Sequence, residues 1–208
     1  MTHDSDWEAR RVYDPVLRFM HAWNALALIA LLATGWLADV FERGPNEALL
    51  WKAHILLGYG LIVGLVTRAL WGVVGPRHAR FSDMWHPRIW IDVVRNRMIR
   101  ASRRFGHNEL ASLAYLGVYA LILAMGATGL ALAAIEHGVG PLSEWLGDAT
   151  WLKKIFKEPH EVISTVLALF VGVHLIALVV HEWLERNHLA RSMLTGIQYR
   201  RREQPDHG

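Results

Sequence analysis

Four long runs of apolar residues alternate along the chain with segments that contain most of its charge. The runs are Val16–Val40, Leu49–Val74, Leu110–Ala134 and Glu161–Trp183. Each holds about 23–26 residues, and a helix of that length crosses a hydrocarbon core of about 30 Å. The pattern predicts an all-α integral membrane protein: a bundle of four transmembrane helices in a single domain over residues 1–208.

Basic residues are distributed unevenly between the loops that these spans define. Of the 22 Lys and Arg residues, 16 lie on the side of the N-terminal segment, the loop between the second and third spans, and the tail, whereas five lie on the side of the other two loops and Arg68 lies inside the second span. Loops rich in Lys and Arg remain in the cytoplasm, so we expect both termini to be cytoplasmic. The net charge of +3 follows from this bias, and it does not indicate a nucleic-acid partner. The loop between the second and third spans also places Ile89, Trp90 and Met98 among arginines, which predicts an amphipathic helix on the lipid surface.

The chain contains 12 histidines and no cysteine. Without cysteine there is no disulfide, no iron–sulfur cluster, no thiolate zinc site and no covalently attached c-type haem. No Asp or Glu lies well inside any of the four runs. The missing carboxylates count against a proton relay or a cation transporter.

Four histidines lie within or at the mouth of the predicted spans: His21, His54, His160 and His174. Each indicates a function or an interhelical hydrogen bond, because ionisable groups are costly inside a membrane. The separation of His160 and His174 along the sequence places them on one helix face, about 21 Å apart along the axis. Depths counted from the span ends give about 20 Å for His21 and His54. The spacing predicts two pairs, His54 with His160 on the outer side and His21 with His174 on the cytoplasmic side.

A pair that used His181 would need a separation of about 31 Å, so we place His181 at the cytoplasmic interface. A bare divalent metal between two neutral imidazoles would leave two positive charges uncompensated in a low dielectric. Haem brings a dianionic ring with four nitrogens and needs only two axial histidines. The pairs therefore predict two haem b groups. Arg68, on the same helix face as His54 and about four turns further along, either neutralises a haem propionate or snorkels to the inner surface.

Several stretches resemble the bacterial cytochrome b561 family, which includes the b-type cytochrome subunits of membrane-bound nickel–iron hydrogenases. They are Val12–Trp36, the run HILLGYGLIVGLVTRALWGVVGPRHARFSD from His54, GHNELA from Gly106, PHEVISTVLALFVGVH from Pro159 and HLARSMLTG from His188. The resemblance implies a four-helix di-haem protein, and its ligands carry over onto His21, His54, His160 and His174. Glu109 departs from the proline expected in this type of GHN motif, which affects only the start of the third span.

From this resemblance we expect an electron-transfer subunit of an oxidoreductase, rather than a complete enzyme, in the bacterial cytoplasmic (inner) membrane. It would link a periplasmic redox partner (a hydrogenase, another dehydrogenase or a c-type cytochrome), docked near residues 141–157, to the membrane quinone pool. Three alternatives stay open. They are a stand-alone quinone oxidoreductase acting on a small oxidant such as superoxide, a histidine-based metal or proton transporter, and a structural anchor for another subunit.

Overall fold

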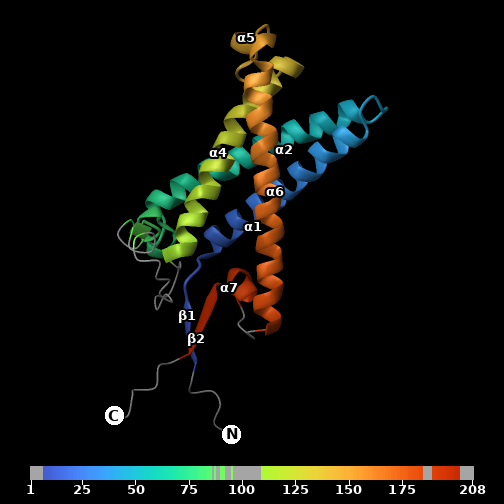
Figure 1. The fold of residues 1–208 in the computed structure, drawn as a ribbon. Helices are drawn as coiled ribbons and strands as arrows, with labels where there is room; N and C mark the ends of the chain where they lie inside the picture. Colours follow the sequence, from blue (N-terminus) through green and yellow to red (C-terminus); the bar gives the residue numbers. More distant parts are fainter. Residues whose placement is uncertain are drawn as a thin grey trace, which may run out of the picture. The chain divides into compact units, whose positions relative to one another are not determined.

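The computed structural model describes residues 7–85, 87, 90–91, 95, 109–184 and 189–201. Four helices in this part are long and apolar enough to cross a membrane (Figure 1). They are α1 (Pro15–Val40), α2 (Glu47–Val74), α4 (Glu109–His137) and α6 (Lys153–Leu184). Each predicted span is thus found as one continuous helix. The amphipathic helix predicted near residues 89–98 lies largely outside the described residues.

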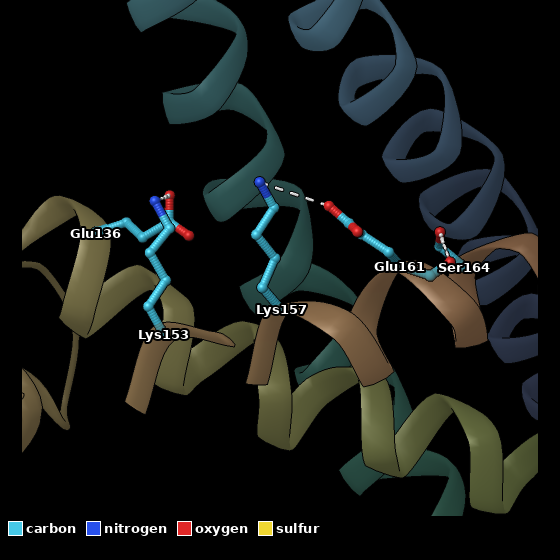
Figure 2. Close-up of polar contacts among 5 residues, drawn as sticks. All are labelled: Glu136, Lys153, Lys157, Glu161 and Ser164. Atoms are coloured by element: carbon cyan, nitrogen blue, oxygen red, sulfur yellow. Dashed lines mark hydrogen bonds and ion pairs between the residues drawn. The ribbon is translucent and has the colours of Figure 1, made fainter. Parts of the chain in front are cut away.

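The N-terminal end of α6 differs from the predicted span. The helix begins at Lys153, before the predicted start at Glu161, and contains Pro159. Proline removes one intrahelical hydrogen bond, but two ion pairs between residues one helical turn apart support the helix. Lys154 pairs with Glu158 at 3.4 Å before the proline, and Lys157 pairs with Glu161 at 3.5 Å across it. Figure 2 shows the second pair. A short helix, α5 (Ser143–Leu146), lies in the loop that precedes α6.

Residues 20–69 and 115–172 form one compact unit, called here the core unit. All four long helices contribute to its buried apolar cluster, which consists of Ala27, Leu28, Leu61, Leu65, Ile122 and Leu167. The indole Nε1 of Trp23 on α1 donates to the carbonyl of Gly60 on α2 at 2.9 Å. Large apolar side chains outside the cluster, such as Leu56 and Leu169, are mostly exposed. An apolar exterior of this kind is typical of helices that face lipid.

The second compact unit, called here the terminal unit, comprises residues 1–19, 70–114 and 173–208, so far as these are described. Strands β1 (Trp7–Arg11) and β2 (Ile197–Arg201) form an antiparallel pair in which Arg11 lies opposite Ile197 (Figure 1). Helix α7 (Leu189–Thr195) directly precedes β2. We call β1, α7 and β2 the terminal clasp. The sequence analysis predicted only helices, so this small sheet is an addition to the all-α fold.

Candidate functional site

The outer histidine pair lies within the core unit. His54 is on α2, about two turns from its start, and His160 is on α6. Their ring centres are 6.4 Å apart and their planes are inclined at 67°. Two imidazoles that bind one metal from opposite sides through bonds of about 2.0–2.1 Å have ring centres roughly 6–6.5 Å apart. The two rings are therefore spaced as the axial ligands of one iron would be.

Each of these imidazoles contacts a threonine on a neighbouring helix. Oγ1 of Thr34 on α1 lies 3.2 Å from Nδ1 of His54. Oγ1 of Thr128 on α4 lies 2.8 Å from Nδ1 of His160. With Nδ1 occupied by a hydroxyl, Nε2 is the nitrogen with which each ring can bind a metal. The sequence analysis did not identify either threonine.

Two carboxylates near the predicted outer pair form ion pairs with lysines. Glu161, which follows His160, pairs with Lys157, and Glu136 pairs with Lys153 at 3.2 Å (Figure 2). Within the described ranges, no group of three or more His, Cys, Asp or Glu side chains is placed to hold a metal ion. Two imidazoles suit a metal that brings most of its ligands with it, and haem iron is such a metal.

Arg68 is a buried cation in the C-terminal half of α2, with 2% of its surface exposed. Its Nε donates to the phenolic oxygen of Tyr119 on α4 at 3.1 Å, and the guanidinium carbon lies 5.6 Å from the centre of that ring. A buried arginine needs anionic or hydrogen-bonding partners. The side chain therefore stays inside the core unit, where an anionic group such as a propionate would be stabilised.

The predicted cytoplasmic pair is divided between the two units. His21 lies on α1 in the core unit, whereas His174 lies on α6 in the terminal unit. Their pairing stays a prediction, as does the interfacial role of His181 further along α6. Of the predicted ligands, the structure thus brings together His54 and His160.

Comparison with known proteins bears on this arrangement. The family model for prokaryotic cytochrome b561 matches residues 12–196. The chain belongs to this family. Membership makes it a multi-pass membrane b-type cytochrome, with haem b as its prosthetic group and electron transfer as its role. The family recognised from the sequence is confirmed.

Three similar proteins are each named as a probable Ni/Fe-hydrogenase B-type cytochrome subunit. The protein from Azotobacter chroococcum mcd 1 is 26% identical, over 94% of this cytochrome and 90% of its own length. The one from Rhizobium leguminosarum bv. viciae is 27% identical, over 89% and 87%. The one from Bradyrhizobium diazoefficiens is 28% identical, over 89% and 84%. No solved structure matches this chain.

Proposed function

We propose that this cytochrome binds two haem b groups and carries electrons across the bacterial cytoplasmic membrane, between a periplasmic redox partner and the quinone pool. The observation that carries the proposal is the 6.4 Å separation of the His54 and His160 rings. Haem b supplies a one-electron iron couple when it is bound. The protein's own part is to hold the iron from two sides and to surround it with apolar helices that exclude water.

The space beside the outer pair supports a flat macrocycle. Gly58 lies one helical turn beyond His54 on α2. Among the described residues, no atom lies within 4 Å of the position that a Cβ at Gly58 would occupy. Glycine leaves room for close approach to a helix backbone. A haem macrocycle held by His54 and His160 would occupy the space beside Gly58.

The second haem would be held by His21 and His174. His21 precedes Thr34 on α1, and Thr34 contacts His54. His174 follows His160 on α6. Counted along each helix, the separation is about 20 Å in both cases. The equal separations along the two helices support their pairing. Arg68 follows His54 on α2 at a comparable step, and would neutralise a propionate of this haem.

The names of the similar proteins support a hydrogenase as the periplasmic partner, and another dehydrogenase or a c-type cytochrome would meet the same electron-transfer requirement. The arginine-rich segments favour cytoplasmic termini, and in that orientation α5 and the His54–His160 pair would lie on the periplasmic side. Trp145 and Trp151 near α5 are 79% and 75% exposed, and exposed aromatic residues are enriched at protein interfaces. We therefore assign partner docking to this outer segment and quinone exchange to the cytoplasmic haem.

A pyridine haemochrome assay on the detergent-purified protein, combined with a reduced-minus-oxidised spectrum, tests the proposal. We expect two low-spin b haems per chain, and rapid reduction of one of them when a short-chain quinol is added. One haem per chain would overturn the paired arrangement. A protein without haem, purified from haem-replete cells, would overturn the electron-transfer function itself.

A further inference from the structure

The two outer histidines are held in the same way by two different helices. Thr34 and Gly35 on α1 lie beside the ring of His54. Thr128 and Gly129 on α4 lie beside the ring of His160. In both places the threonine hydroxyl lies at Nδ1. We call each Thr–Gly dipeptide a threonine–glycine pair.

The direction of each hydrogen bond follows from a second contact of the hydroxyl. Oγ1 of Thr34 lies 2.8 Å from the carbonyl oxygen of Ala30, and Oγ1 of Thr128 lies 2.8 Å from that of Ala124. A carbonyl oxygen only accepts, so the single hydroxyl proton is directed to the helix backbone. The hydroxyl lone pairs then face the imidazole. Nδ1 of His54 and Nδ1 of His160 must therefore be the donors, each carrying the ring proton.

The glycines leave room at the same edge of each ring. A Cβ at Gly35 would lie 3.4 Å from Cε1 of His54, and a Cβ at Gly129 would lie 3.3 Å from Cε1 of His160. Cε1 is bonded to Nδ1, so the threonine hydroxyl and the space left by the missing Cβ lie beside adjacent atoms of one imidazole. The hydroxyl fixes Nδ1, and the glycine allows the ring edge to approach the helix backbone closely.

We propose that Thr34 and Thr128 are positioning residues that keep His54 and His160 in the Nδ1-protonated form and direct Nε2 of both rings to one iron. The inference rests on the proposed function, because it concerns the outer haem. Donation from Nδ1–H to a hydroxyl increases the electron density of the imidazole. The threonines therefore favour the ferric state and lower the midpoint potential of the outer haem.

Valine replaces threonine at nearly equal volume and removes only the hydroxyl, so Thr34→Val and Thr128→Val are the test variants. Thr34→Ser and Thr128→Ser keep a hydroxyl. Thr67→Val and Thr165→Val are matched controls, because these hydroxyls also donate to the carbonyl one helical turn earlier, at 2.8 and 3.0 Å, but lie on exposed helix faces. Each variant is purified with its haem and examined by redox titration and by low-temperature EPR.

In the valine variants we expect the midpoint potential of one of the two haems to rise and its low-spin EPR signal to shift. The serine variants should restore both properties, and the controls should match the unsubstituted protein. Wild-type potentials and EPR signals in both valine variants would overturn the inference, as would equal loss of haem in the valine and serine variants. If the unsubstituted protein contains no haem bound by His54 and His160, the proposed function fails instead, which the haemochrome assay detects separately.

Discussion

Arg68 and Tyr119 join α2 to α4 through a hydrogen bond of 3.1 Å from the guanidinium Nε to the phenolic oxygen. The bond orients a cation that is almost completely buried in the core unit. Orientation matters here because a guanidinium recognises a carboxylate through its planar fork of donors. Tyr119 accepts from Nε, and the guanidinium carbon lies 5.6 Å from the centre of its ring.

Replacing Arg68 with glutamine should lower the midpoint potential of one haem. The loss of a nearby positive charge favours the ferric state, and at intermediate effective dielectric the effect is about 1–2 kcal/mol, or roughly 40–90 mV. Tyr119→Phe retains the charge and should produce a smaller shift. Redox titration followed in the visible spectrum measures both variants. Potentials unchanged in Arg68→Gln would place the arginine away from any haem.

Alanine at His54 or at His160 should remove the same haem. Each iron needs both axial ligands, so either substitution, and also the double substitution, should leave roughly half of the haem per chain. His137→Ala is the matched control, because the ring of His137 lies 5.8 Å from Trp51, which is itself 5.8 Å from His54. Haemochrome stoichiometry decides the result. Different haem contents in the two single variants would argue against a shared iron.

Alanine at Gly129 tests the ring contact that the glycine permits. The added Cβ would lie 3.3 Å from Cε1 of His160, so the imidazole must move by a few tenths of an ångström. We expect the EPR signal of the outer haem to shift while the haem content stays close to that of the unsubstituted protein. Gly117→Ala on the same helix is the control, since no described atom lies within 4 Å of its Cβ position. Identical spectra for the two variants would mean that the ring does not depend on this contact.

The four spans could be predicted because long, predominantly apolar runs have few other interpretations. The similar depth of His54 and His160 in the membrane could also be calculated from the sequence, because an α-helix has a known rise per residue. The start of α6 could not, because Pro159 and three lysines in this segment are typical of a loop. Only the ion pairs one turn apart explain why the helix extends to Lys153.

The two threonines beside the histidines and the terminal clasp are only weakly indicated by the sequence. A threonine in an apolar helix usually bonds to its own backbone, so Thr34 and Thr128 look ordinary when each is taken alone. The repeated tripeptide Ala-Thr-Gly, at residues 33–35 and 127–129, is the signal that could have identified them. The terminal clasp joins strands from the two ends of the chain, and local propensity contains no information about such distant pairing.

Asp14 stabilises the start of α1, and its replacement should reduce stability measurably. Its Oδ1 accepts hydrogen bonds from the backbone N–H of Leu17 at 3.0 Å and from Nε1 of Trp71 at 3.2 Å. Asp14→Ala should lower the free energy of unfolding by about 1–2 kcal/mol, because it removes both a helix cap and an indole partner. Asp14→Asn should be nearly neutral, since asparagine caps helices as well. Thermal unfolding in detergent measures the difference, and equal losses in both variants would show that the charge, not the cap, matters.

Arg18 should control how firmly the terminal clasp is closed. Its Nε donates to the carbonyl of Met193 at 3.0 Å, and a terminal nitrogen donates to the carbonyl of Leu194. Both carbonyls lie near the C-terminal end of α7. The clasp is further held by the carbonyl of Gly196, which accepts from the N–H groups of Val12 and Tyr13 at 2.9 and 3.2 Å.

Removing the guanidinium in Arg18→Ala should accelerate tryptic cleavage of the C-terminal strand about tenfold, because two charge-assisted hydrogen bonds are lost and the open form becomes more populated. Arg80→Ala is a suitable control. Arg80 also donates to a backbone carbonyl, that of Gly75 at 2.7 Å, but it lies outside the clasp. The cleavage rate is measured by mass spectrometry of timed digests. If Arg18→Ala and Arg80→Ala are cleaved at the same rate, the two strands alone keep the clasp closed.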